Sequence, residues 1–317
     1  MELTRKNLKG SMVALVTPIR QGKIDERALK RLLDFHLENG TDVIVPCGTT
    51  GEASTMSHEE HKGVMSFVID YVNHRVPVIC GAGSNCTEEA VPLLQHAKKK
   101  GADGVLVVTP YYNKPTQEGL FRHYEFLAKK VDIPIVVYNV PGRTGVSIAP
   151  ETVARLSKIS NIVGIKEASG ILEQAIRIVS LCDVTLISGE DSLTLPLLSV
   201  GAKGAISVVA NVAPRQSHDL IAAYLSGNIE KAKKLHYELF ELSKVLFIET
   251  NPIPVKTALA AMGMIHEEFR LPLCEMSSEH RKELLRVLKA GGFLNREAVI
   301  PAKAGIQQVA GSPRARG

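Results

Sequence analysis

Short apolar runs rich in β-branched residues recur along the chain, separated by longer segments that mix apolar and polar residues. Apolar character on both faces is typical of strands that are covered on both sides, as in a parallel sheet. The sequence therefore predicts strands at residues 13–17, 43–47, 76–80, 104–109, 133–138, 162–166, 184–188 and 205–209.

The segments between the early runs have the spacing of amphipathic helices. Asp25, Ser57 and Thr87 are capping-type residues near their starts. Gly40 and Gly101 stand where a glycine commonly ends a helix. We expect these helices at residues 26–39, 57–73 and 87–100.

Repeated strand and helix units predict an α/β fold, a (β/α)8 TIM barrel over residues 1–213. A doubly wound open sheet is the alternative, but no GxGxxG motif follows the first run. A C-terminal helical subdomain is expected over residues 214–292, interrupted by the two prolines in residues 251–254. Its helical stretches are residues 215–226, 229–249 and 277–290. Residues 293–317 lack periodicity and are expected to form a disordered tail.

The formal net charge of +5 indicates little about partners, because much of it falls in that tail. Arg296, Lys303, Arg314 and Arg316 stand there against Glu297, which leaves +2 for the rest of the chain. We therefore expect no basic face for nucleic acid. The absence of Trp and an aromatic content of 5% also argue against platforms for base stacking.

The cysteines are odd in number and none forms a CxxC pair, so neither a disulfide framework nor a metal site is indicated. They are Cys47, Cys80, Cys86, Cys182 and Cys274. This usage fits a reducing cytoplasm. No secretory leader pattern and no apolar run of membrane-spanning length is present, so we expect a cytoplasmic protein without membrane contact.

The run at residues 162–166 is unusual because it ends in a lysine. Strand alternation predicts that Ile162, Gly164 and Lys166 share one face, with Gly164 leaving room beside the lysine stem. Desolvation disfavours a charged amine, and a neutral amine attacks a carbonyl to form a Schiff base. A lysine that reaches solvent or pairs with a carboxylate is the alternative.

Hydroxyls, phenols and a guanidinium follow several of the predicted strands. They occupy residues 48–52, 110–113, 138–144 and 188–191. Active sites of (β/α)8 barrels lie at the carboxyl ends of the strands, so these groups and Lys166 are expected at one mouth.

Schiff-base chemistry on a keto acid needs an amine, a proton shuttle and donors for a carboxylate. Lys166 supplies the amine, and the Tyr138 phenol can donate or accept a proton. Thr49 can link two phenols, and Arg143 can hold a carboxylate through two parallel hydrogen bonds. Each residue also has a purely structural alternative. Tyr138 could be a half-buried core residue, and Thr49 and Thr50 could hydrogen-bond the backbone of a turn. Arg143 could lie in a solvated turn, and Tyr111-Tyr112 could pack at the rim.

Residues 48–52, 138–144 and 164–167 resemble the signatures of the dihydrodipicolinate synthase family, pyruvate-dependent class I aldolases that include N-acetylneuraminate lyase. The resemblance covers about residues 10–291. It implies that pyruvate condenses with L-aspartate 4-semialdehyde through an imine on Lys166, giving 4-hydroxy-tetrahydrodipicolinate. This is the first committed step of lysine and diaminopimelate biosynthesis, and no metal or organic cofactor is implied.

The resemblance also implies roles for single residues. Tyr138, Thr49 and Tyr112 form a proton relay, with Tyr112 contributed by a neighbouring subunit. At least a homodimer follows, and the family implies a tetramer built as a dimer of dimers. The residues implied for binding the substrates are Thr50, the backbone at Gly189 and Ile206, and Arg143.

In lysine-inhibited members of the family, a cleft at the dimer interface binds L-lysine. The matching positions are Ala53, Ser54, His58, His61, Asn85, Glu89 and Tyr111. His61 and Glu89 are the residue types that accompany lysine sensitivity, whereas Ala53 and Ser54 reverse the Ser-Ala order common in the family. The alternative is that His58 and His61 lie on a solvated helix face.

Two other functions compete with the synthase. One is a sibling lyase acting on sialic acid or a 2-keto-3-deoxy sugar acid, which would share Lys166 and Tyr138. Thr49, in place of the serine of the sialic-acid branch, and Arg143 favour the synthase. The other is a barrel kept as a non-catalytic scaffold, which has no need to keep amine, phenols, threonine and guanidinium together.

Overall fold

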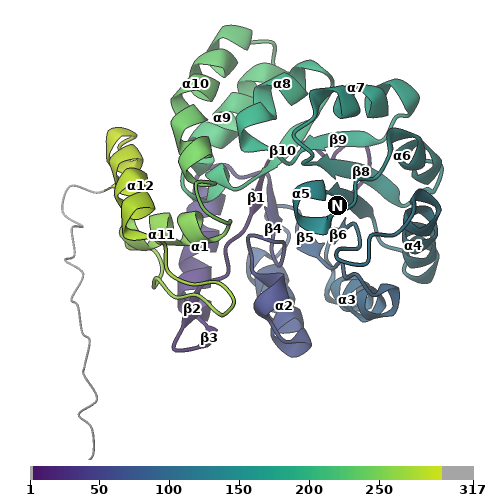
Figure 1. Cartoon of the computed structure of the whole chain (residues 1–317), viewed down its shortest axis with the longest axis horizontal. Helices are drawn as coiled ribbons and strands as arrows, with labels where there is room; N and C mark the ends of the chain where they lie inside the picture. Colours follow the sequence, from purple (N-terminus) through teal and green to yellow (C-terminus); the bar gives the residue numbers. More distant parts are fainter. Residues whose placement is uncertain (1–2, 295–317) are drawn as a thin grey trace, which may run out of the picture.

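The computed structural model describes residues 3–294. Eight parallel strands form one sheet in the order β4-β1-β10-β9-β8-β7-β6-β5, and a parallel bridge between Ile44 and Val78 joins its two edges. Helices alternate with these strands and surround them, which confirms the expected (β/α)8 barrel (Figure 1). The strands are β1 Gly10–Ala14, β4 Val43–Val45, β5 Ile79–Gly81, β6 Gly104–Val108, β7 Ile135–Asn139, β8 Ile162–Glu167, β9 Thr185–Ser188 and β10 Gly204–Ser207.

Three expected helices begin and end within a residue or so of their predicted bounds. They are α1 Glu26–Glu38, α2 His58–Val72 and α3 Thr87–Lys100. The remaining helices are α4 Gln117–Lys130, α5 Pro141–Thr144, α6 Pro150–Leu156, α7 Leu172–Leu181, α8 Thr194–Ser199, α9 Pro214–Leu225, α10 Ile229–Val245, α11 Ile253–Ala261 and α12 Ser278–Ala290. Short 3₁₀ turns are η1 Ala53–Thr55, η2 Asp191–Leu193 and η3 Val209–Asn211.

The side chains of two capping residues bond the first turns of their helices, but Thr87 does not. Asp25 accepts from the Ala28 amide, and Ser57 accepts from the Glu60 amide. Thr87 is already the first helical residue of α3, because Cys86 precedes the helix, and the Thr87 hydroxyl bonds His123 instead. The prediction of a Thr87 cap was therefore wrong.

Apolar side chains pack on both sides of the barrel wall, which explains why the strand runs are apolar throughout. One cluster lies between the strands and the surrounding helices and includes Val105 and Ile165. A second, smaller cluster fills the barrel interior and includes Met12, Val136 and Ile187. The space above the interior cluster is left for polar residues at the strand ends.

Strand β8 does not alternate as the sequence predicts. Its register with β7 shifts, so that Ile135 pairs with Ile162 and Val136 pairs with Gly164. As a result Ile162 packs in the outer cluster and Val163 in the interior cluster. The expectation that Ile162 shares a face with Lys166 was wrong, because the irregularity at Val163 moves one residue to the other face.

Two elements have no counterpart in the prediction. Strands β2 (Ile19–Arg20) and β3 (Lys23–Ile24) form a small antiparallel hairpin. Its two turn residues, Gln21 and Gly22, have positive φ, as a tight hairpin requires. Helix α11 begins directly after Pro252 and carries Pro254 in its first turn, where a helix tolerates proline.

Helix α9 packs against both β1 and α10, and α11 and α12 follow it in the chain. The division of the chain at residues 213 and 214 stays a prediction. Figure 1 shows α11 and α12 together at one side of the molecule, on the same side as α1. Of the expected tail, Phe293 and Leu294 pack against the core, and residues 295–317 lie outside the described part. Within residues 3–294, no helix combines the length and apolar character that a membrane crossing demands.

Candidate active site

The Lys166 side chain lies inside the barrel mouth and is only 6% exposed. Lys166 on β8 is the register partner of Tyr138 on β7, and Lys166 Nζ lies 4.3 Å from the centroid of the Tyr138 ring. Within residues 3–294, no carboxylate forms an ion pair with Lys166. The lysine thus neither reaches bulk solvent nor pairs with an acid, which removes both structural alternatives for it.

The neighbouring carboxylate of Glu167 points to the opposite face of β8. There it accepts hydrogen bonds from the Ser169 amide at 2.7 Å, from Asn139 Nδ2 at 3.0 Å and from Gln174 Nε2 at 3.1 Å. These donors satisfy the carboxylate outside the barrel interior, so it does not turn toward the Lys166 amine.

The space beside the Lys166 stem comes from Gly189 and not from Gly164. A Cβ atom at Gly189 would lie 2.9 Å from Lys166 Cε, whereas one at Gly164 would lie 2.4 Å from Leu8 Cδ2. Gly164 does face the barrel interior, but a leucine from the N-terminal segment fills the space there. The expectation that Gly164 leaves room for the lysine was therefore wrong.

Six of the predicted catalytic and substrate-binding residues line one pocket of about 540 Å³ at the barrel mouth. They are Lys166, Tyr138, Thr49, Thr50, Arg143 and Gly189. The polar groups of the pocket come from β7, β8 and the segments that follow the strands, including Arg143 on the short helix α5.

Two predicted site residues lie elsewhere in this chain. Tyr112 is 89% exposed, with φ +74°, and does not line the pocket. Ile206 is buried in the interior cluster, below the residues that line the pocket. The next residue to face the pocket on that side is Val208.

Asn251 is a pocket residue that the sequence reasoning missed. Its Nδ2 donates to Thr50 Oγ1 at 3.0 Å, and its main-chain oxygen accepts from Arg143 Nη2 at 3.0 Å. It stands just before α11, in residues 251–254, whose two prolines were expected only to interrupt a helix. An asparagine beside a proline is a common turn signal, so the sequence alone offered no reason to place it here.

Two acidic residues lie beside the pocket. Glu190 lines it, and burial, with the Asp191 charge as a second cause, raises the pKa of the Glu190 carboxyl. Asp191 accepts from the amides of Val208 and Val209 at 2.9 and 3.1 Å, and burial raises its pKa despite these bonds. Both shifts reduce the negative charge near Lys166 at a given pH.

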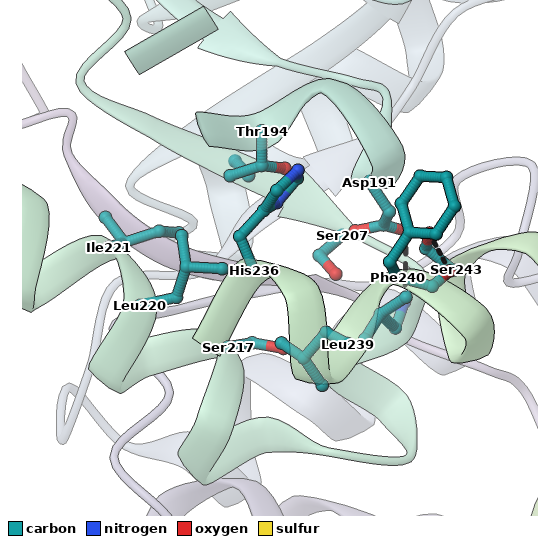
Figure 2. A pocket seen from close by; sticks show the side chains of 12 residues that line it. Asp191, Thr194, Ser207, Ser217, Leu220, Ile221, His236, Leu239, Phe240 and Ser243 are labelled. Carbon is teal, nitrogen blue, oxygen red and sulfur yellow. Dashed lines mark hydrogen bonds between the residues drawn. The ribbon is translucent and has the colours of Figure 1, made fainter. Parts of the chain in front are cut away.

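A second, tighter cavity lies behind Asp191. Figure 2 shows it between Asp191, the first residue of η2, Ser207 at the end of β10, and the helical residues His236 and Phe240. Neither Lys166 nor any other of the predicted catalytic residues lines it. Burial lowers the pKa of His236, as expected for a histidine in a mostly apolar cavity.

A wider cleft of about 1300 Å³ adjoins the pocket and shares Thr49, Tyr138 and Arg143 with it. The cleft contains six of the positions predicted for lysine, namely Ala53, Ser54, His58, His61, Glu89 and Tyr111. Asn85 does not line it, and its carbonyl accepts from Asn113 Nδ2 at 2.9 Å.

The two histidines of this cleft differ. His58 is exposed, as a solvated helix face would have it. His61 is buried, donates from Nε2 to the Gly81 carbonyl at 2.8 Å, and has a pKa lowered by burial. Nearby, the Ser84 hydroxyl donates to Glu89 at 3.0 Å.

Comparison with known proteins agrees with this geometry. The sequence model of the dihydrodipicolinate synthetase family matches residues 7–291. A protein of Thermodesulfovibrio yellowstonii named 4-hydroxy-tetrahydrodipicolinate synthase is 56% identical over 288 residues, covering 90% of this chain and 99% of that relative.

Solved structures are similar to this chain as well. The crystal structure of dihydrodipicolinate synthase from Aquifex aeolicus has a TM-score of 0.90 and 50% identity, covering 91% of this chain and 100% of that chain. The enzyme from Cyanidioschyzon merolae with lysine bound has a TM-score of 0.88 and 39% identity, covering 91% of this chain and 99% of that chain. The chain therefore belongs to the dihydrodipicolinate synthetase family.

Proposed function

We propose that the pocket around Lys166 condenses pyruvate with L-aspartate 4-semialdehyde to 4-hydroxy-tetrahydrodipicolinate. As a family member, the chain is a lyase of the class I aldolase type, acting at the first committed step of lysine and diaminopimelate biosynthesis. The observation that most supports the assignment to this pocket is the buried Lys166 amine, which lies against the Tyr138 ring without a carboxylate partner.

The first half of the reaction makes a nucleophile from pyruvate. The Lys166 amine attacks the C2 carbonyl of pyruvate, and loss of water from the carbinolamine gives an imine. Removal of a proton from C3 then gives the enamine. Tyr138 is positioned beside the amine to donate and accept these protons, with Thr49 in the same pocket as the next group of the relay.

The second half joins the substrates. The enamine carbon attacks the aldehyde carbon of aspartate semialdehyde, and the resulting alkoxide takes a proton. The amine of that substrate then attacks the imine carbon, closes the ring and releases Lys166. Ring closure therefore regenerates the free enzyme without hydrolysis of the imine by water.

The two substrate carboxylates need separate donors. Thr50 and the backbone at Gly189 are assigned to pyruvate, together with the backbone at Ile206, whose side chain packs in the interior cluster. Arg143, at the outer side of the pocket, is assigned to the carboxylate of aspartate semialdehyde, which it can bind with two parallel hydrogen bonds.

Tyr112 is assigned to the relay of a neighbouring subunit. Its side chain is almost fully exposed, and its backbone adopts the left-handed region that bulky residues rarely occupy. Both features fit a phenol held outward for insertion into a second copy of the chain. The proposed assembly is at least a dimer, and a tetramer if two such dimers pair; the mass of the protein in solution tests this.

L-Lysine is proposed as an inhibitor that binds in the cleft beside the pocket. The Glu89 carboxylate suits the ammonium groups of lysine, and Tyr111 and the histidines supply further polar contacts. The lysine-bound relative supports this proposal. An unchanged initial rate in millimolar lysine would contradict it.

The experiment that tests the reaction is a coupled assay with pyruvate and each candidate aldehyde. We expect product formation with aspartate semialdehyde and at most trace turnover with N-acetylmannosamine or simple sugar aldehydes. Faster turnover of a sugar aldehyde would favour the sibling lyase instead. No turnover with any of them would favour the scaffold.

A further inference from the structure

Asn251 contacts both residues that are assigned to substrate carboxylates. Its side-chain amide donates to the Thr50 hydroxyl at 3.0 Å, and its main-chain carbonyl accepts from the Arg143 guanidinium at 3.0 Å. Asn251 is only 4% exposed and Thr50 only 3% exposed, so water does not compete with the bond between them. A single residue thus links the proposed pyruvate site to the proposed semialdehyde site.

The direction of the first bond matters for chemistry. A threonine hydroxyl has one proton to donate and can accept from another group. Because the Asn251 amide donates to Thr50 Oγ1, the Thr50 proton is not used in this bond. Within residues 3–294 no other side-chain hydrogen bond of Thr50 is present, and Thr50 lines the pocket, so its proton is available to a bound anion there.

The Asn251 side chain also carries an energetic penalty. Its Oδ1 atom is buried and has no hydrogen-bond partner among the described residues. A buried polar atom left without a partner lowers stability, whereas an apolar side chain of similar shape avoids this loss. Packing alone therefore gives no reason for an asparagine at this position.

We propose that Asn251 is a positioning residue, whose amide orients the Thr50 hydroxyl so that its proton points at the carboxylate of pyruvate. This inference rests on the proposed assignment of Thr50 to pyruvate. The contact with Arg143 uses only the main chain of Asn251, so a change of its side chain affects the pyruvate site selectively.

The test uses Asn251→Leu, Thr50→Val and the double variant, each in the full-length protein. The readout is the pyruvate concentration that gives half-maximal borohydride trapping of the imine, which needs neither the second substrate nor turnover. We expect Asn251→Leu to raise this concentration roughly 10-fold, as loss of one oriented hydrogen bond to a charged group implies. The KM for aspartate semialdehyde should change by less than about twofold, and the melting temperature should stay equal or rise.

The double variant separates an indirect role from an independent one. If Asn251 acts through Thr50, the double variant traps pyruvate no more weakly than Thr50→Val alone. The inference would be overturned if the two single variants' increases in the half-maximal pyruvate concentration multiplied in the double variant. It would also be overturned if Asn251→Leu left this concentration unchanged while Thr50→Val raised it. Either result would leave the proposed function standing. Normal trapping by Thr50→Val would instead contradict the assignment of Thr50 to pyruvate.

Two further variants guard against misfolding. Asn251→Ala is smaller and serves if Asn251→Leu does not fold, with the same expected loss of pyruvate affinity. Asn161→Leu is the matched control, because Asn161 precedes β8 at the end away from Lys166 and bonds the Ala128 carbonyl at 3.0 Å. It should lower the melting temperature and leave pyruvate trapping unchanged. Weaker trapping in this control as well would show that lost stability accounts for the Asn251 result, and would overturn the inference.

Discussion

Lys256 and Glu52 form an ion pair in which neither side chain is exposed to solvent. Glu52 ends the loop that carries Thr49 and Thr50, and Lys256 belongs to α11, so the pair ties the C-terminal helices to the active-site loop. Burial lowers the pKa of Lys256, and the Glu52 carboxylate opposes this shift. Among the residues that the structure describes, two lysines are thus buried in different ways: Lys256 is paired and structural, and Lys166 is unpaired and assigned to catalysis.

Replacing Lys256 with methionine should lower the free energy of unfolding by about 3–5 kcal/mol, because the Glu52 charge would remain buried without a partner. Urea unfolding followed by far-ultraviolet circular dichroism measures this loss. The double variant Glu52→Gln with Lys256→Met removes both charges and should recover most of it. A single variant as stable as the unchanged protein would show that the pair does not hold the loop.

Gly189→Ala should remove most activity while the fold persists. Its new Cβ would lie 2.9 Å from Lys166 Cε and 2.7 Å from the Ala168 Cβ, so the lysine stem must move. A displacement of this size can cost on the order of 100-fold in rate. Gly142→Ala is the matched control, since a Cβ there meets nothing within 4 Å. Equal steady-state rates for the two variants would contradict the placement of the lysine.

Tyr138→Phe should still form the imine with pyruvate but lose turnover by roughly 100- to 10,000-fold, the usual contribution of a general acid or base. The phenol oxygen is lost, while the ring that packs against Lys166 is kept. Trapping with borohydride measures the first property and the coupled assay the second. Full activity in this variant would remove Tyr138 from the mechanism.

Much of the barrel could be predicted because its strands are buried on both faces and its helices on one. The run at residues 104–109 and the helix at residues 87–100 match the structure within a residue. The first strand was placed three residues late, since β1 begins at Gly10 and the apolar run continues beyond its end. An apolar run indicates which residues are buried, and the buried residues continue past the end of the hydrogen-bonded strand.

The arrangement within the site could be predicted less completely. The positions of Lys166 and Tyr138 follow from strand ends in a closed barrel. The irregularity at Val163 and the exchange of roles between Gly164 and Gly189 depend on the register between neighbouring strands, which no local pattern encodes. Asn251 and Thr50 are 201 residues apart in the sequence, and Asn251 stands just before α11, a helix that the sequence did not predict because of its prolines.

His36 makes the fold sensitive to acid. It is fully buried, and desolvation lowers its pKa from 6.5 to about 3. Well above pH 6.5 it is neutral in both states and contributes no pH dependence. As pH falls from 6.5 toward 3, the unfolded state binds a proton that the folded state does not, so stability is lost.

For this one group the loss between pH 7.5 and pH 5 is about 2 kcal/mol, by linkage from those two pKa values. Urea unfolding at both pH values, compared with the non-titrating His36→Gln, isolates it. Between pH 7.5 and pH 5, the free energy of unfolding of the variant should fall by about 2 kcal/mol less than that of the unchanged protein. An equal loss of unfolding free energy in both proteins would mean that His36 also gains a proton in the folded state.

The most direct test of the catalytic assignment is reduction with borohydride in the presence of pyruvate, followed by peptide mass mapping. The buried, unpaired amine on β8 predicts one adduct, on Lys166, and none on the paired Lys256. An adduct on any other residue, or no adduct under conditions that support turnover, would contradict the assignment.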